Sequence, residues 1–93
     1  MKKIKEIARV LAETNDEDII EKFLVSILTK KELDEISSRW ELVKLLNLGL
    51  SQRKISEKLG LSLCKITRGS KELKKKYSAF KQMINAYDKI SKK

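Results

Sequence analysis

The sequence lacks several residues on which whole classes of protein depend. Its 93 residues contain no His, no Pro, one Cys, three Gly and few aromatic side chains. A lone Cys64 excludes an internal disulfide, and the absence of His excludes the usual zinc-binding frameworks. Without His, and with no carboxylate pair or nucleophile placed beside a base, the chain offers no general acid–base constellation. We therefore do not expect an enzyme.

Long hydrophobic runs are missing as well. The apolar stretches are short and interrupted by charges, so we identify no transmembrane span or signal peptide and expect a cytoplasmic protein. The length predicts a single small domain over residues 1–93, which would bury only about 60–65% of its unfolded surface. Leu, Ile, Lys and Glu dominate the composition, and this favours an all-α fold.

The positive charge is unevenly distributed along the chain. The net charge is +9, yet residues 1–48 carry nine Lys and Arg against ten Asp and Glu. Residues 49–93 carry thirteen Lys and Arg against three Asp and Glu, so all of the excess lies in the second half. Basic residues interleaved with apolar ones predict a face that binds a polyanion.

Apolar residues at helical spacing predict the first two helices. Ile4, Ile7 and Leu11 mark an amphipathic helix over about residues 2–13. Asn15 and Asp16 are N-cap candidates for the next helix, and the acidic residues that follow suit its first turn.

A third helix begins with a capping box and is apolar around most of its circumference. In "TKKE", Glu32 is placed to reach back to the Thr29 amide. Its apolar positions are Leu33, Ile36, Trp40, Leu42, Val43, Leu45, Leu46 and Leu48. The apolar residues of such a helix must pack against other apolar surfaces on several sides, and a small monomer does not supply enough of them. We therefore expect residues 1–48 to form the dimerisation core of an intertwined homodimer.

Residues 51–75, which begin "SQRKISEKLGLSLCKITRGSKEL", carry the pattern of a helix-turn-helix. Gly49 ends the preceding helix, Ser51 and Ser62 are N-cap candidates, and Gly60 allows the positive φ of the turn. Ser56 is small where the two helices should cross. Ile55, Leu59 and Ile66 are expected to meet between the two helices, and Leu61 is a further apolar position of the pattern. A generic helical hairpin is the alternative, but the fit of the pattern and the local charge favour the helix-turn-helix.

The second helix of this motif, expected over residues 63–75, would lie in the major groove with its N-terminal residues against base edges. Leu63 or Cys64 would touch a thymine methyl, and Lys65 would donate to guanine. A third base contact is expected from Thr67. Phosphate contacts, which set affinity and salt dependence, are expected from Arg53, Lys54, Lys58, Lys71 and Lys74. We interpret Cys64 as a small apolar contact rather than a redox sensor.

A last amphipathic helix is expected over about residues 76–90, within a C-terminal packing segment, residues 76–93. Its apolar residues are Tyr77, Phe80, Met83, Ile84, Tyr87 and Ile90. Packing in the core or in a dimer is the favoured role. A basic amphipathic helix at a membrane surface is the alternative.

Several segments of the chain resemble the tryptophan repressor family. They are "LT" before the third helix, Arg39 within it, "LSQRKISEKLG" and "ITRGS", and the resemblance covers about residues 23–73. It implies an interleaved, all-helical homodimer that binds L-tryptophan as co-repressor and then binds palindromic DNA operators in tryptophan-related promoters. No other cofactor is implied.

The resemblance also implies a ligand site. Arg39 and Arg68 look like the two arginines that flank the indole, with Arg68 also holding the carboxylate, and Gly69 resembles the glycine beside the ligand. Guanidinium planes stack on aromatic rings and pair bidentately with carboxylates. The segment of the partner chain that closes the pocket and helps bind the amino group is matched by Ser26, Leu28 and Thr29. A salt bridge on the helix surface is the alternative role for the arginines.

Gly69 fits the family's site, whereas Glu72 departs from it. Gly inside a helix costs about 1 kcal/mol relative to Ala, and we interpret Gly69 as leaving space for a flat ligand beside Arg68. Where the family usually has a small polar residue, this chain has Glu72, on the same helix face as Arg68. Glu72 would accept the ligand's ammonium, compete for the Arg68 guanidinium, or lie exposed without a role. Two other hypotheses stay open: DNA binding with a different effector or none, and a helical module that binds an acidic protein.

Overall fold

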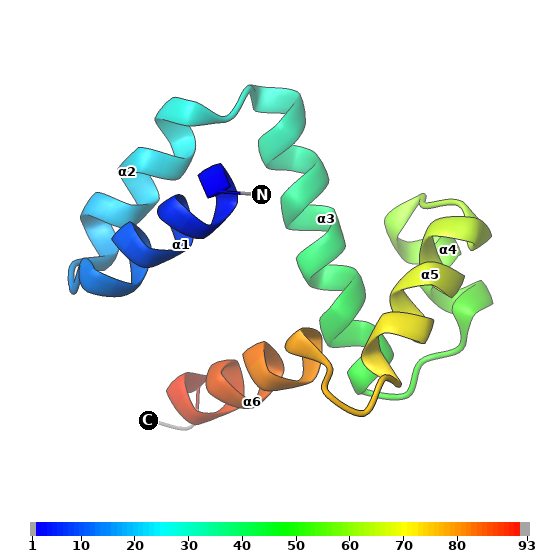
Figure 1. Ribbon diagram of the computed structural model, residues 1–93. Coiled ribbons are helices and arrows are strands. Elements are labelled where there is room, and N and C mark those ends of the chain that lie inside the picture. The colour runs from blue at the N-terminus through cyan, green and yellow to red at the C-terminus, as the bar shows by residue number, and fades with distance from the viewer. Residues whose placement is uncertain (1, 92–93) are drawn as a thin grey trace. The chain divides into compact units, whose positions relative to one another are not determined.

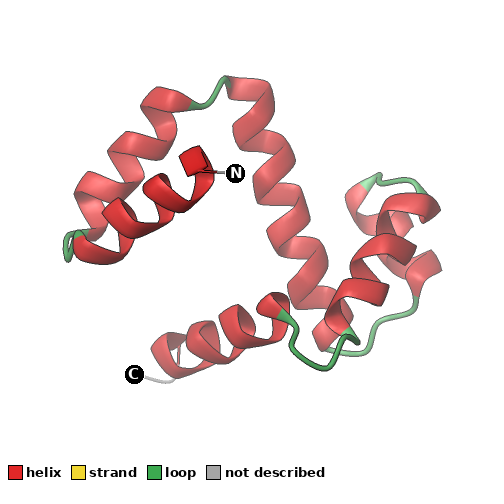
Figure 2. Cartoon of the chain, viewed as in Figure 1, coloured by secondary structure: helices red, strands yellow, loops and turns green. Residues whose placement is uncertain are grey.

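The computed structural model describes residues 2–91, and every regular element in that range is an α-helix (Figure 1 and Figure 2). The helices are α1 (Lys2–Glu13), α2 (Glu17–Ile27), α3 (Lys30–Asn47), α4 (Gln52–Leu59), α5 (Leu63–Leu73) and α6 (Ala79–Ser91). These elements confirm the predicted all-α fold with about six helices. None of the helices in this range is long and apolar enough to cross a membrane.

The chain divides into two compact units between Glu35 and Ile36, within α3. The N-terminal unit holds α1 and α2, and the C-terminal unit holds α4, α5 and α6. Neither Lys2–Glu13 nor Glu17–Ile27 contains a buried residue. The exposed large apolar side chains of these two helices include Ile4, Val10, Ile19, Val25 and Ile27. The N-terminal unit therefore has no hydrophobic core of its own.

Local hydrogen bonds fix the ends of α1 and α2. The Thr14 hydroxyl donates to the Val10 carbonyl over 2.7 Å just after α1 ends, and α1 has the bounds that the periodicity predicts. Asp16 is the N-cap of α2, and its Oδ1 accepts hydrogen bonds from the amides of Asp18 and Ile19 at 3.0 and 3.2 Å. These contacts satisfy amide groups that the first turn of a helix leaves free.

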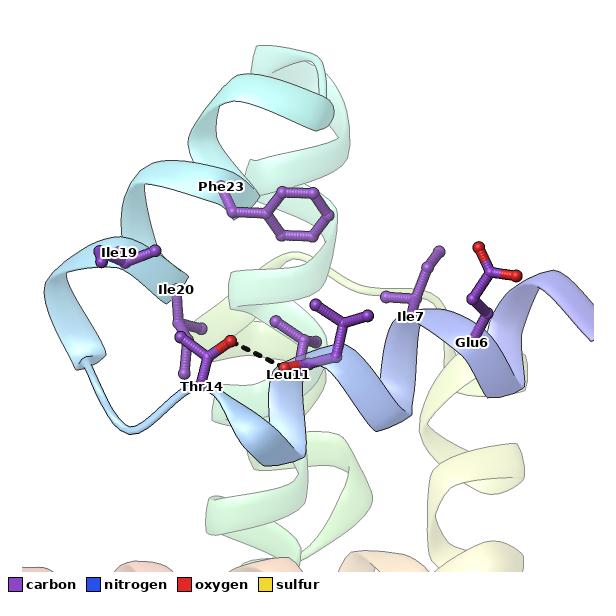
Figure 3. A pocket seen from close by; sticks show the side chains of 8 residues that line it. Glu6, Ile7, Leu11, Thr14, Ile19, Ile20 and Phe23 are labelled. Carbon is purple, nitrogen blue, oxygen red and sulfur yellow. Dashed lines mark hydrogen bonds between the residues drawn. The ribbon is translucent and has the colours of Figure 1, made fainter.

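An apolar cleft of about 310 Å³ lies between α1 and α2 (Figure 3). It is lined by Glu6, Ile7, Val10, Leu11, Thr14, Ile19, Ile20 and Phe23. The two helices thus face each other with apolar side chains but leave the space between those side chains partly unfilled.

The start of α3 confirms the predicted capping box. The Thr29 amide donates to Glu32 Oε1 over 2.8 Å, and the Glu32 amide donates to the Thr29 hydroxyl over 3.1 Å. This reciprocal pair fixes where the helix begins.

The C-terminal unit contains the hydrophobic core. Leu42 and Leu45 from α3 pack with Ile55 from α4 and Ile66 from α5, and the two isoleucines are completely buried. The half-buried residues around them are Leu46, Leu50, Leu59 and Leu61. Val43 of α3 and Ile84 of α6 are buried as well. Three of the four helices that meet here therefore share one apolar cluster, and α6 packs against α5.

Gly49 ends α3, as the sequence predicts, and turns the chain toward α4. Its φ of +89° lies in the left-handed region, where a Cβ would be strained. The Gly49 amide donates to the Leu46 carbonyl over 3.1 Å, and the Leu50 amide donates to the Leu45 carbonyl over 3.3 Å. This pair of bonds is a Schellman motif, which satisfies the last carbonyls of the helix.

Two predicted helix boundaries are wrong. The α5 helix ends at Leu73 instead of Lys75, and α6 begins at Ala79 instead of Lys76. The later start of α6 is explained by Ser78, a buried residue whose hydroxyl accepts a hydrogen bond from the Lys81 amide over 3.2 Å and so acts as an N-cap. Tyr77 therefore precedes α6, and it is 82% exposed rather than part of an apolar helix face. Residues 92–93 of the predicted C-terminal segment lie outside the described residues.

Aromatic and charged side chains connect α3 to α6. The rings of Trp40 and Tyr87 meet edge to face with their centroids 5.9 Å apart. The Lys44 ammonium lies 5.1 Å from the Tyr87 ring centroid and 2.9 Å from the Glu41 carboxylate. The hydrogen bond to Glu41 raises the pKa of Lys44, because the carboxylate stabilises the charged ammonium.

Candidate nucleic-acid interface and ligand site

The geometry of α4, the turn and α5 is that of a helix-turn-helix. Gly60 caps α4 with φ +68°, and its amide donates to the Ser56 carbonyl over 2.8 Å. The Ser56 hydroxyl donates to the Leu61 carbonyl over 2.8 Å, so this small residue also holds the turn. Ile55 and Ile66 meet in the core beneath the turn. Both the predicted turn and the predicted helix contact are confirmed.

The N-terminal turn of α5 presents its side chains to solvent. Ser62 is the N-cap, and its hydroxyl accepts a hydrogen bond from the Lys65 amide over 3.3 Å. Leu63, Cys64 and Lys65, which are three of the predicted base-reading residues, are exposed, and Leu63 is 56% accessible. A helix N-terminus carries a partial positive charge and attracts anions such as phosphate. This end of α5 can therefore meet an anionic groove with its side chains free.

The predicted phosphate-contacting residues surround this end and continue along α5. Each of them is exposed: Arg53, Lys54 and Lys58 on α4, Lys71 on α5, and Lys74 directly after it. Since only one acidic residue stands in α4 and one in α5, the helix-turn-helix is strongly basic.

Thr67 differs from the other predicted base-reading residues. It is half-buried, and its hydroxyl donates to Gln52 Oε1 over 2.9 Å. The bond joins the middle of α5 to the first turn of α4, so Thr67 contributes to the mutual orientation of the two helices. Sequence reasoning missed Gln52. Its place directly after the N-cap Ser51, on the same basic segment, was the available signal.

Gly69 lies where α5 approaches α3 closely. Gly69 is buried, and a Cβ at this position would lie 3.2 Å from Leu42 Cδ2 and 3.4 Å from Leu46 Cδ1. The distance to Leu42 is shorter than ordinary van der Waals contact and the distance to Leu46 is at its lower limit, so a methyl group here would require the Leu42 side chain to shift. The structure thus gives Gly69 a packing partner within its own chain, which the interpretation as ligand space had not included.

The same helix crossing brings the two candidate ligand arginines onto neighbouring helices. Arg39 precedes Leu42 by three residues, about 4.5 Å along the axis of α3, and Arg68 directly precedes Gly69. Both arginines are exposed. The crossing that Gly69 permits therefore leaves two guanidinium groups, from α3 and α5, available to a ligand.

Glu72 pairs with a residue that the sequence reasoning had not considered. Its Oε1 lies 2.8 Å from the Lys75 Nζ, and the Glu72 side chain is 42% exposed. Within residues 2–91 the ion pairs are this one and Lys44–Glu41, so Glu72 does not pair with Arg68. The hypothesis that Glu72 occupies the Arg68 guanidinium is therefore wrong for this conformation.

The remaining predicted ligand residues lie at the end of α2 in the N-terminal unit. Ser26 is in the last turn, Leu28 is the C-cap, and Thr29 begins the capping box. A helix C-terminus leaves carbonyl groups without amide partners and carries a partial negative charge. These carbonyl oxygens can accept hydrogen bonds from an ammonium group.

The amino-acid sequence of the chain is similar to a known protein family and to several known proteins. The family described as Trp repressor protein matches residues 2–88. A Trp operon repressor homolog of Vibrio parahaemolyticus is 35% identical over 81 residues, which cover 86% of this chain and 79% of that protein. A Trp operon repressor homolog of Xylella fastidiosa strain M23 is 37% identical, and the match covers 72% of this chain and 74% of that protein. One of Chlamydia trachomatis serovar D is 39% identical, and the match covers 69% of this chain and 73% of that protein. No solved structure matches the chain significantly.

Proposed function

The chain belongs to the Trp repressor protein family, and from this premise we propose that it is a sequence-specific DNA-binding repressor that requires L-tryptophan as co-repressor. Its operators are palindromic and lie in tryptophan-related promoters. The observation that carries the proposal is the capped, exposed N-terminus of α5 within a strongly basic helix-turn-helix.

In this proposal the first turn of α5 reads bases and the surrounding lysines and arginines bind phosphates. Leu63 or Cys64 contacts a thymine methyl group, and Lys65 donates to guanine. Thr67 supports the reading surface through its bond to Gln52. Phosphate contacts come from Arg53, Lys54, Lys58, Lys71 and Lys74, and they give the affinity its salt dependence.

The repressor acts as a homodimer whose interface includes the N-terminal unit. The exposed apolar faces of α1 and α2 support this, because helices without a buried residue gain little stability from a single chain. A two-fold symmetric dimer presents two α5 helices to two half-sites, which explains why the operator is palindromic.

L-Tryptophan binds between α5 of one chain and the end of α2 of its partner. Arg68 pairs bidentately with the ligand carboxylate, and Arg39 stacks on the indole. The ligand lies beside Gly69 and Glu72, and the partner's α2 end, at Ser26, Leu28 and Thr29, accepts its ammonium group. The ligand favours the DNA-competent spacing of the two α5 helices, because it binds that conformation better than the relaxed one.

Operator binding with and without L-tryptophan tests both parts of the proposal. Duplexes are selected from a random library with L-tryptophan present, and their affinity is then measured at one fixed salt concentration. We expect the ligand to tighten binding about 5- to 150-fold, as is typical of allosteric coupling. Equal affinity in both conditions would reject the co-repressor and leave a repressor with a different effector or none. Failure to select any sequence would reject the DNA-binding function.

A matched pair of variants locates the reading surface. Lys65→Gln should relax the base preference at one position in each half-site, whereas Lys30→Gln on α3 should leave the selected sequence unchanged, although each removes one exposed positive charge.

A further inference from the structure

Three charged side chains lie along one face of α5 and its C-terminal turn. Arg68, Glu72 and Lys75 are spaced at i, i+4 and i+7, so the central carboxylate has a cation on each side. The structure shows which cation it selects, because Glu72 Oε1 is 2.8 Å from the Lys75 Nζ. The Lys75 amide also donates to the Glu72 carbonyl over 3.3 Å, since the helix has already ended at Leu73.

The order of the charges explains this selection. A Glu that precedes a Lys along a helix forms a better pair than a Glu that follows a cation, because the cation then lies toward the negative C-terminal end. Lys75 lies on the C-terminal side of Glu72, and Arg68 lies on its N-terminal side. An exposed pair of this kind is weak, so its loss would redistribute Glu72 between partners rather than disturb the fold.

We propose that Lys75 is a positioning residue for ligand binding, which holds the Glu72 carboxylate and so leaves the Arg68 guanidinium to the carboxylate of an amino-acid ligand. The inference rests on the proposed function, in which Arg68 binds that carboxylate. Without Lys75, Glu72 turns toward Arg68 and competes with the ligand for the same two N–H donors. Lys75 itself makes no contact with the ligand.

Two ligands and a set of variants test this inference. Calorimetry of the full chain measures the dissociation constants of L-tryptophan and of indole-3-propionate, which has the carboxylate but no ammonium. Lys75→Gln should weaken both ligands by the same factor, about two- to fivefold. Lys75→Arg should restore wild-type affinity, because it restores the ion pair.

A second substitution separates competition from a general charge effect. In a Glu72→Gln background, Lys75→Gln should have no effect, because no carboxylate remains to compete. Lys76→Gln is the matched control, since it removes an exposed positive charge at the next residue and should leave both affinities unchanged. Circular dichroism of each variant checks that the helices are intact.

Several results would overturn the inference. One is that Lys75→Gln binds the ligands as tightly as the wild type or more tightly. Another is that Lys75→Gln loses as much affinity in the Glu72→Gln background as it does alone. A third is a loss of affinity for L-tryptophan only, which would assign Glu72 to the ammonium group. If the wild-type chain binds neither ligand, the co-repressor proposal fails and this inference fails with it. If the wild-type chain binds both and Lys75→Gln binds them equally well, only this inference fails.

Discussion

The N-terminal and C-terminal units have similar apolar stripes but differ in what covers them. In α1 and α2 most of the large aliphatic residues are exposed and none is buried, and the space between the helices is an open apolar cleft. In the C-terminal unit, Ile55 and Ile66 are completely shielded by residues of α3, α4 and α5. An amphipathic sequence thus produces a helix in both units, but only the second unit supplies its own packing partner. The N-terminal unit therefore gains little stability from contacts of its own, which is what the proposed homodimer would supply, whereas the helix-turn-helix is held within one chain.

The largest expected effect is on the proposed homodimer. Val25→Asp places a charge on an apolar face of α2 that is 56% exposed in the single chain. If this face is buried between two copies, the dimer dissociation constant should rise about a hundredfold or more, because an unpaired buried charge is strongly unfavourable. Sedimentation equilibrium measures the change, and Lys22→Asp on the same helix is the control. Equal dimer dissociation constants for the two variants would show that Val25 lies outside the dimer interface.

Ile66→Ala should be the most damaging change inside the C-terminal unit. Truncating this completely buried side chain should lower the free energy of unfolding by about 2–5 kcal/mol, through lost burial and a cavity. Leu63→Ala, one turn earlier on α5 and exposed, should change it by less than about 0.5 kcal/mol. Urea unfolding measures both variants. Similar losses would contradict the assignment of the core to this face of α5.

Gly69→Ala tests the close approach of α5 to α3. The added methyl group would lie 3.2 Å from a side-chain carbon of Leu42, which is buried and has little room to move. We expect a net destabilisation of about 1 kcal/mol, even though Ala favours the helix by a similar amount. Adding Leu42→Ala should relieve the crowding, so the double variant should be more stable than the sum of the two single changes predicts. Additive losses would show that the two residues do not crowd each other.

The smallest expected effect concerns the cation between α3 and α6. Glu41→Gln should lower the pKa of the Lys44 ammonium toward its ordinary 10.5, because the carboxylate that stabilises the charged ammonium is lost. Because the pKa of Lys44 is raised in the folded state, its charged form stabilises the fold at pH values below the pKa of the unfolded chain. This stabilisation is lost as the pH rises through the pKa of the folded state. NMR titration of the Lys44 side chain measures the shift. An unchanged pKa would assign the effect to Tyr87 instead.

Much of the fold is predictable because it depends on residues close in sequence. The Thr29–Glu32 capping box, the N-cap serines and the turns at Gly49 and Gly60 each involve only a few neighbouring residues. These local signals place five helix boundaries correctly, namely the starts of α3, α4 and α5 and the ends of α3 and α4. The start of α6 was misplaced because Tyr77 fits the apolar period, although Ser78 is the residue that caps the helix.

The candidate site is less predictable because its contacts join separate helices or depend on a choice between partners. The bond from Thr67 to Gln52 and the approach of Gly69 to Leu42 depend on how α5 packs against α4 and α3. Periodicity indicates which face of a helix is apolar but not which atoms meet there. Glu72 pairs with Lys75, which lies beyond the end of α5 at Leu73. The sequence pattern predicts that this helix ends two residues later, at Lys75.

The aromatic contact between α3 and α6 also gives the chain a built-in optical probe. Its only tryptophan, Trp40, and both tyrosines lie in the C-terminal unit, and none lies in residues 1–35. Trp40 touches Tyr87, so its fluorescence should report whether α6 remains docked on α3. Far-ultraviolet circular dichroism reports all six helices together. Where the two signals change at different denaturant concentrations, the N-terminal helices and the C-terminal unit unfold as separate cooperative steps, and no label is needed to observe this.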